Sequence, residues 1–399
     1  MQALQRRTFG CVRVAWNRTL AARHQRYAAG GEGTSYAQTD RALTAMKRDP
    51  GLTFLNEVSS VPLQQALRHQ HAAFQAFFAG RARYPRFKSR YGKQSATYTR
   101  SAFRMKDGQL WLAKADGPLS FAWTWPGVDV TTLDPTSVTV AREPCGRWYV
   151  TFQVDEPNPV PLPATGGSVG VDLGVKDFAV TSGGERIANP RHLARKARNL
   201  ARYQRRLARC QQGSANRAKA AAKVARAHRK VRASRADFLH RASARLARDN
   251  DVIVIEDLAV SNMVRNRRLA RAISDCGWGE FRRQLEYKAA RAGRRLIVID
   301  RWYPSSKSCS ACGHLLASLN LSTRAWECPS CGTRHDRDIN AAKNILAAGL
   351  AVSACGADVR HSGSLRVRSA VKQEPQPVTA GIPSSRAGSS QALKYLASG

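Results

Sequence analysis

Four of the nine cysteines fall into two close pairs, and their spacing is typical of a metal site. Cys309 and Cys312 form the first pair and Cys328 and Cys331 the second, with 15 residues between the pairs and a glycine directly after each. A Cys-x-x-Cys turn directs two thiolates at one ion, so the two turns together predict a four-thiolate zinc site. Four thiolates leave no open coordination position, and we therefore expect a structural zinc rather than a catalytic one.

The other interpretation of these pairs, redox-active or incidental cysteines, is the weaker one. His314 and His335 lie in the same stretch, and we expect them to be bystanders rather than ligands. The start of the chain, MQALQRRTFGCVRVAW, lacks the apolar segment of a secretory signal, which favours metal binding in a reducing cytosol over disulfides. The remaining cysteines are scattered and are expected to be ordinary thiols: Cys11, Cys145, Cys210, Cys276 and Cys355.

Three acidic residues lie on expected strands and a helix at positions where their carboxylates could bind a metal ion. In the expected strand VGVDLGV, Asp172 shares a face with Gly170 and Gly174, which leaves room for a metal and a phosphate to approach. Glu256 ends the apolar run DVIVIE, which is typical of a buried central strand, and a carboxylate there is costly unless it is paired or binds a metal. Asp338 falls in the first turn of an expected final helix, DINAAKNILAAGL.

Each acid alone has an ordinary explanation, as a turn residue, a solvated strand end or a helix cap. Together, the order strand-Asp, strand-Glu and helix-Asp within an α/β pattern predicts a site in which three carboxylates hold two Mg²⁺ ions about 4 Å apart. Asp336 and Asp338 compete for the third place. We assign helix capping to Asp336 and metal binding to Asp338, and we expect Asp177 and Asp257 to be structural.

The charge of the chain favours a polyanionic partner. Lys and Arg number 65 against 28 acids, a net charge of +37, and the cations are spread along the chain rather than gathered in one membrane anchor. One segment, residues 76–98, alternates cations with aromatic side chains, which suits phosphates and stacked bases, although a solvated charged loop is the alternative. Its candidate contacts are Arg81, Arg83, Tyr84, Arg86, Phe87, Lys88 and Arg90.

The elements that must position these residues follow from periodicity and composition. Residues 1–90 are expected to be mostly helical, and residues 110–154 contain short β-rich runs. Prolines alternate from Pro157 to Pro163, which predicts a stiff linker at 155–167. Residues 191–248 carry 19 Lys or Arg and one acid around leucines and valines at seven-residue spacing, which predicts a basic helical hairpin with an apolar seam.

Four segments resemble a known family: GVDLGVKDFAV, IVIEDLAVSNM, SSKSCSACG and CPSCGTRHDRDINAAKNIL. They are similar, in this order, to the transposon-encoded TnpB proteins, also called OrfB-type transposases, which resemble compact ancestors of the CRISPR type V effectors. The resemblance covers about residues 10–348. Family members begin with a strand and loop ahead of the segment that resembles GCVRVAWN here, so we expect the N-terminal barrel of this chain to lack its first strand.

The resemblance implies an α/β fold in which an RNase H-like (RuvC) nuclease domain is interrupted by a zinc ribbon. The family's catalytic acids map onto Asp172, Glu256 and Asp338, and its zinc ligands map onto the four paired cysteines. The domains expected are a wedge-like barrel with a helical recognition insertion at 1–154, the linker at 155–167, the nuclease domain at 168–348 with the basic hairpin at 191–248 and the zinc ribbon at 306–335, and a disordered tail at 349–399.

The leading functional hypothesis is an RNA-guided, Mg²⁺-dependent DNA endonuclease of a mobile element. The resemblance implies a guide RNA from the transposon end as partner, double-stranded DNA as substrate, no membrane, and a cytoplasmic, nucleoid-associated location. The alternative is a catalytically silent nucleic-acid-binding accessory or regulator of transposition. A transposase that itself joins strands through the same acids ranks third.

Overall fold

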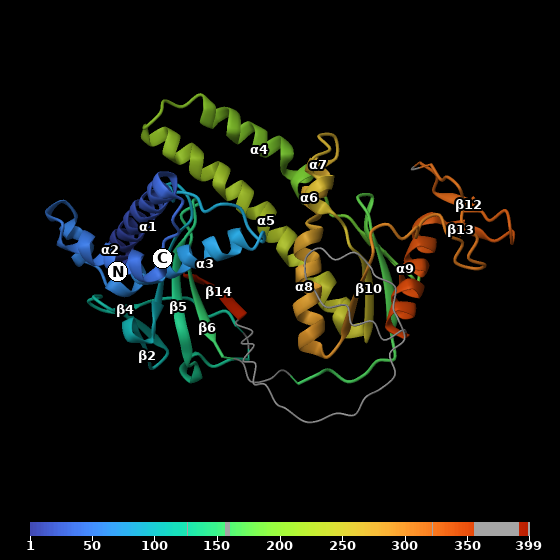
Figure 1. Ribbon diagram of the computed structural model, residues 1–399, viewed down its shortest axis with the longest axis horizontal. Helices are drawn as coiled ribbons and strands as arrows, with labels where there is room; N and C mark the ends of the chain where they lie inside the picture. The colour runs from blue at the N-terminus through green and yellow to red at the C-terminus, as the bar shows by residue number, and fades with distance from the viewer. Residues whose placement is uncertain (126, 156–159, 321, 355–390, 398–399) are drawn as a thin grey trace. The chain divides into compact units, whose positions relative to one another are not determined.

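The computed structural model describes residues 1–399 except 126, 156–159, 321, 355–390 and 398–399 (Figure 1). The chain divides into two compact units, one of residues 1–157, 221–225 and 383–399 and one of residues 158–220 and 226–382. The division falls inside the predicted linker. The described residues of that linker, 155 and 160–167, contain neither helix nor strand. Residues 160–167 belong to the second unit, where the backbone N–H of Gly166, for example, donates to Asp251 at 2.7 Å.

Helices dominate the start of the first unit, as predicted. They are α1 (Gln2–Gly30), α2 (Tyr36–Arg48), the short 3₁₀ segment η1 (Pro50–Asn56) and α3 (Ser60–Phe78). Local sequence explains their ends: α1 stops where Gly31 adopts a left-handed conformation, and Ser35 and Gln38 form a reciprocal cap at the start of α2. Leu63 and Leu67 of α3 are fully buried in the core of this unit.

The strands of the first unit form two open sheets. The four-stranded order is β1-β5-β6-β14 and the three-stranded order is β2-β3-β4. The predicted wedge-like barrel is therefore not supported, because in the described residues neither sheet closes on itself and β2 to β4 pair with one another. The strands are β1 (Gln94–Thr99), β2 (Phe103–Lys106), β3 (Gln109–Leu112), β4 (Pro118–Leu119), β5 (Pro135–Arg142), β6 (Trp148–Val154) and β14 (Gln391–Ala397).

The predicted disordered tail is wrong in two places. Residues 349–354 continue helix α9 (Arg337–Ala354), and residues 391–397 form β14, which pairs antiparallel with β6. Main-chain hydrogen bonds to a sheet edge do not require a side-chain pattern, so composition gave no signal for this strand. Residues 355–390 and 398–399 of the predicted tail lie outside the described residues.

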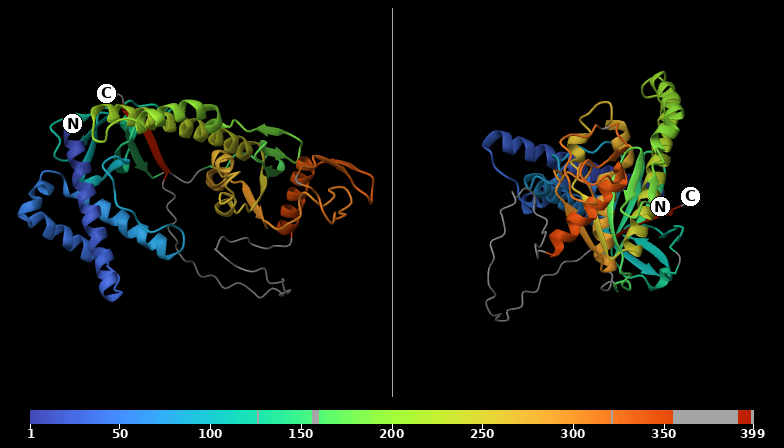
Figure 2. Two further views of the ribbon diagram at one scale, coloured as in Figure 1. Left: turned by 90° about the horizontal axis from the view of Figure 1, so that it is seen from above. Right: turned by 90° about the vertical axis from the view of Figure 1, so that its right-hand side faces the viewer.

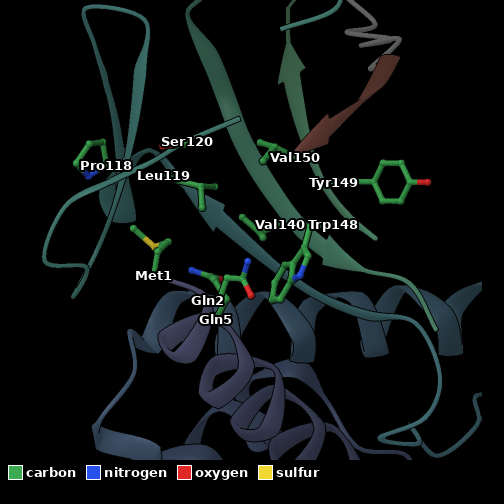
Figure 3. Close-up of a pocket in the computed structure, with 10 residues that line it drawn as sticks. All are labelled: Met1, Gln2, Gln5, Pro118, Leu119, Ser120, Val140, Trp148, Tyr149 and Val150. Carbon is green, nitrogen blue, oxygen red and sulfur yellow. The ribbon is translucent and has the colours of Figure 1, made fainter. Parts of the chain in front are cut away.

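A cavity of about 200 Å³ lies in the first unit, between the start of α1 and the strands (Figure 3). Apolar and neutral polar residues line it, and the lining contains no carboxylate, histidine or cysteine. It is therefore not a candidate for metal-dependent chemistry. Its lining residues are Met1, Gln2, Gln5, Pro118, Leu119, Ser120, Val140, Trp148, Tyr149 and Val150.

A five-stranded mixed sheet forms the centre of the second unit, in the order β11-β10-β7-β8-β9. The central strand pairs are parallel, β10 with both β7 and β11, whereas β8 and β9 add antiparallel strands at one edge. The expected strand at VGVDLGV is confirmed as β7, and β8 and β9 follow it in the chain. The strands are β7 (Ser168–Leu173), β8 (Asp177–Thr181), β9 (Arg186–Ala188), β10 (Val252–Glu256) and β11 (Arg295–Ile299).

Different helices cover the two faces of this sheet. Ile253 and Ile255 of β10 pack in one core with α8 (Trp278–Ala292), α7 (Ala270–Cys276) and the end of α5. Val254 points to the opposite face and packs against α9. Side chains alternate along a strand, so Glu256 lies on the α9 face together with Val254. A short helix, α6 (Val260–Met263), follows β10.

Two glycines let α9 approach the sheet closely. A Cβ atom on Gly170 of β7 would lie 2.1 Å from the backbone oxygen of Ala342, and one on Gly349 would lie 2.4 Å from a methyl carbon of Val254. Neither distance is compatible with van der Waals contact. Helix α9, which carries Asp338, therefore packs against the sheet at two positions where only glycine fits. This close packing sets the distance of Asp338 from the strands.

Replacing Gly170 with alanine is expected to destabilise the second unit by about 1–3 kcal/mol or more, because the clash is with backbone and α9 must move. Chemical unfolding followed by circular dichroism measures this. Gly279→Ala is the matched control: it lies in helix α8 with open space around the new methyl group, and it should leave stability unchanged or raise it slightly. Equal stability of the two variants would contradict the close packing.

The predicted basic hairpin is confirmed as two antiparallel helices, α4 (His192–Ala208) and α5 (Ala215–Asp249), which Figures 1 and 2 both show side by side. The break at 211–214 ends with Ser214, whose hydroxyl accepts from the backbone N–H of Arg217 and caps α5. Leu200 and Val231 of the predicted seam are buried. Among the described residues, no helix combines the length and the apolar character that a membrane crossing requires.

Candidate active site

Asp172 lies in β7 on the face covered by α9, two residues after Gly170. Burial, together with the nearby carboxylates of Glu256 and Asp338, raises the pKa of its carboxyl group to about 7, while Arg337 opposes the shift. An aspartate in this position is costly to ionise without a cation. The shift therefore indicates an acid that requires a positive partner.

Glu256 ends β10, the strand next to β7. Burial raises the pKa of its carboxyl group, and a hydrogen bond from the hydroxyl of Ser305 partly offsets this shift. The Ser305 Oγ atom lies 2.5 Å from the Glu256 Oε1 atom. Parallel strands bring their carboxyl ends to one edge of the sheet, and this places Glu256 near Asp172.

Of the two aspartates Asp336 and Asp338, Asp336 is the one that caps α9, as predicted. Asp336 Oδ1 accepts hydrogen bonds from the backbone N–H groups of Asp338 and Ile339, each at 3.1 Å, so Asp336 caps α9. Asp338 lies in the first turn of the helix and does not act as its cap. Its carboxylate lies 3.7 Å from an Arg186 nitrogen and 3.8 Å from an Arg324 nitrogen.

The carboxylates of Glu256 and Asp338 both act on Asp172, but the three acids do not surround one point. Among the described residues, the four cysteines are the group whose ligand atoms all lie within 4.8 Å of one another, and the three carboxylates do not meet that spacing. Two ions about 4 Å apart spread their ligands more widely than one ion does. The donor set consists of oxygen atoms alone, the chemistry that Mg²⁺ prefers, so the residues fit a pair of such ions.

The four cysteines lie together in a cluster that could hold a metal ion, as the predicted zinc site requires. Cys309 Sγ lies 3.7 Å from Cys331 Sγ, and Cys312 Sγ lies 3.6 Å from Cys328 Sγ. A tetrahedron with Zn–S bonds of about 2.3 Å has S···S edges of about 3.8 Å, so the geometry fits zinc. Hydrogen bonds with Thr333 and with the neighbouring thiols lower the pKa of the Cys331 thiol to about 6, whereas the neighbouring thiols and burial raise the pKa of the Cys312 thiol to about 11. Cys331 is therefore the one of these two thiols that ionises first.

The cysteine cluster lies in a small ribbon that precedes α9. Its strands β12 (Ala325–Glu327) and β13 (Arg334–Asp336) pair antiparallel, and β13 runs directly into the helix. His335 does not belong to the cluster of four ligand atoms, in keeping with the expectation, but it contacts one of them: its Nε2 atom lies 3.0 Å from Cys309 Sγ, and its ring packs on Trp326. The cysteine spacing gave no signal for this contact.

Sequence reasoning also missed a group of polar residues around the acids. Arg186 bonds to Asp177 at 2.8 Å and to Asp336 at 2.7 Å, and so links β8, β9 and the start of α9. Ser305 contacts Glu256, and two buried asparagines of α9 contact the backbone next to Ser305. The predicted structural role of Asp177 fits this ion pair. Asp257 pairs with Arg282 and Arg301.

The structure places the predicted nucleic-acid segment in the first unit, as an irregular stretch after α3. Its backbone is fixed by α1: Trp16 donates to the carbonyl oxygen of Arg86 at 2.9 Å, and Asn17 bonds with the backbone of Lys88. Lys88 also lies over the Trp16 ring, 4.4 Å from its centroid. Most of the other predicted contacts are exposed, and Phe87 is 63% exposed, so the segment presents cations and an aromatic ring to solvent.

Comparison of the sequence with protein families agrees with this arrangement. The OrfB_IS605 family, described as "Probable transposase", matches residues 151–267, which include Asp172 and Glu256. A family described as "Cas12f1-like, TNB domain" matches residues 278–345, which include the cysteines and Asp338. A "Helix-turn-helix domain" family matches residues 2–32, which form α1 and its glycine cap in this structure.

Similar proteins span nearly the whole chain. A Streptomyces pristinaespiralis protein named "Putative RNA-guided DNA endonuclease" is 52% identical over 380 residues, with 94% of each chain covered. The Escherichia coli (strain K12) protein named "Putative RNA-guided DNA endonuclease InsQ" is 33% identical over 387 residues, with 93% of each chain covered. Among solved structures, a Cas12f1-sgRNA-target DNA complex has a similar fold, with a TM-score of 0.51, 16% identity, and coverage of 85% of this chain and 81% of that one. The chain therefore belongs to the OrfB_IS605 transposase family of TnpB-like proteins.

Proposed function

We propose that this protein is an RNA-guided, Mg²⁺-dependent endonuclease that cuts double-stranded DNA with an RNase H-like (RuvC) site. The observation that carries the proposal is the placement of Asp172 and Glu256 on the α9 face of one mixed sheet, with Asp338 in the first turn of α9 near Asp172. The sheet order β11-β10-β7-β8-β9, with parallel strands beside an antiparallel edge, supports the fold class. The names of the two full-length relatives support the reaction and the RNA guide.

The proposed catalytic residues act as metal ligands. Asp172 and Glu256 present carboxylates from neighbouring strands, and Asp338 presents the third from the first turn of α9. When bound, two Mg²⁺ ions activate the attacking water and stabilise the leaving oxygen of the phosphodiester. The capping of α9 by Asp336 holds the first turn in place, and the hydroxyl of Ser305 orients Glu256.

Separate surfaces are proposed for the nucleic acids. The basic hairpin α4–α5 has cations on its exposed faces and suits the backbone of a guide–target duplex. The segment after α3 offers cations and the exposed Phe87 for phosphates and bases. None of these side chains needs to read sequence if base pairing with the guide does so. The guide is proposed to come from the transposon end.

The test is purification of the protein from cells that carry the native element, followed by sequencing of the bound RNA. The complex is then incubated with Mg²⁺ and a DNA library in which a guide-matched target has randomised flanks. We expect one discrete RNA and cuts that require both the guide match and a short flanking motif. Bound RNA without cutting would instead support a nucleic-acid-binding accessory, and absence of any discrete RNA would refute the guided mechanism. Joined strands among the products would indicate a transposase.

A further inference from the structure

The zinc ribbon and the acid Glu256 are joined by a chain of hydrogen bonds through buried polar residues. The chain begins at two asparagines on α9, Asn340 and Asn344, which are 1% and 5% exposed. Both point at the segment that leads from β11 into the first cysteine pair. A buried amide is costly unless its donors and acceptors are satisfied, so each asparagine needs specific partners.

Those partners are backbone groups of the ribbon's entry segment. Asn344 Nδ2 donates to the carbonyl oxygens of Ser305 at 2.8 Å and of Ser308 at 2.6 Å. Asn340 Nδ2 donates to the carbonyl oxygen of Ser308 at 2.7 Å, and its Oδ1 accepts from the backbone N–H of Ser310 at 2.9 Å. Ser308 and Ser310 flank the zinc ligand Cys309. The asparagines therefore fix the backbone on both sides of that ligand.

The same segment holds Glu256. Ser305 is 6% exposed, its carbonyl oxygen accepts from Asn344, and its hydroxyl donates to Glu256 Oε1 at 2.5 Å. A change in the backbone around Cys309 is therefore expected to shift Ser305 relative to α9 and to change the support of Glu256. Groups that orient a metal ligand in this way commonly change metal affinity by about 10–100-fold when removed.

We propose that Ser305, Asn340 and Asn344 form a positioning network through which the zinc ribbon sets the affinity of the acid cluster for its divalent ion. The network rests on the proposed nuclease site, since it assigns Glu256 as a ligand. It gives the ribbon a role beyond folding: the ordered cysteine pair keeps Ser305 in place, and Ser305 keeps the Glu256 carboxylate directed at the ion. None of the three residues contacts the substrate in this assignment, so they are positioning residues.

The experiment measures Mn²⁺ binding to the full-length protein in complex with its RNA and without DNA, from the electron paramagnetic resonance signal of free Mn²⁺. Ser305→Ala is expected to raise the Mn²⁺ dissociation constant about tenfold while the zinc content, measured by mass spectrometry, stays unchanged. Ser306→Ala is the matched control. It removes a hydroxyl from the neighbouring half-buried serine, and it should leave Mn²⁺ binding unchanged.

A double-mutant cycle tests the connection to zinc. Cys328→Ser, which removes a zinc ligand, should also weaken Mn²⁺ binding, and its effect should be largely lost in the Ser305→Ala background because both changes act through one hydroxyl. Fully additive effects of the two substitutions would refute the network. Unchanged Mn²⁺ affinity in Ser305→Ala would refute it as well.

Failure of this inference is distinguishable from failure of the proposed function. If the wild-type complex binds Mn²⁺ and Asp172→Asn abolishes that binding, the acid cluster is a metal site whatever Ser305 does. If the wild-type complex shows no Mn²⁺ binding that depends on Asp172, the proposed nuclease site is refuted, and the proposed network is refuted as well.

Discussion

Asp172→Asn is expected to lower the rate of DNA cleavage by at least about 1,000-fold while RNA and DNA binding persist. The substitution keeps the shape of the side chain but removes the charge that holds a divalent ion, and loss of metal-ion catalysis corresponds to several kcal/mol of transition-state stabilisation. Single-turnover cleavage of a guide-matched duplex gives the rate. Electrophoretic mobility shift in Ca²⁺ gives the binding.

The folded protein should tolerate this change well. In the metal-free protein the Asp172 carboxylate is buried and is repelled by Glu256 and Asp338, so removal of its charge relieves an unfavourable interaction. The melting temperature of metal-free Asp172→Asn is therefore expected to equal or exceed that of the wild type. Asp134→Asn, at an exposed acid that pairs with Arg100 in the first unit, is the matched control and should cleave normally. Wild-type cleavage by Asp172→Asn would exclude the proposed site.

Cys309→Ser is expected to remove the bound zinc and to lower the cleavage rate at least about tenfold, without unfolding the five-stranded sheet. Structural zinc supplies much of the folding free energy of small ribbons, and Cys309 is one of the two ligands buried in this ribbon. The sheet has its own apolar cores, which do not include the cysteine pairs. Zinc content, limited proteolysis within 306–335 and single-turnover cleavage together measure the effect.

Cys210→Ser is the control for this variant. Its thiol lies at the end of α4 and bonds only to the backbone oxygen of Arg206 in the described contacts, so the substitution should change neither zinc content nor cleavage. Undiminished cleavage by zinc-free Cys309→Ser would show that the ribbon has no part in placing Asp338 or Glu256. Retention of a full equivalent of zinc would show that another group, such as His335, can replace the missing thiolate.

Much of the functional site was predictable because its residues carry local signals. The duplicated Cys-x-x-Cys spacing indicates a zinc site before any fold is known, and the thiolate geometry fits it. Alternation along β7 predicted that Asp172 shares a face with Gly170, and the structure has both on the face covered by α9, where Glu256 of β10 also lies. The cap at Asp336 followed from its position before the helix, and its two backbone hydrogen bonds confirm it.

The sequence by itself determined the candidate ligand types, the helical hairpin and the strands β7 and β10, because periodicity and short spacings reflect interactions between near neighbours in the chain. The tertiary structure alone decided how distant segments meet. The open sheets in place of a barrel, the pairing of β14 with β6, and the contact of His335 with Cys309 each join groups that no local pattern relates. The link from Asn344 through Ser305 to Glu256 is of the same kind, since a polar side chain reveals its partner only when burial requires one.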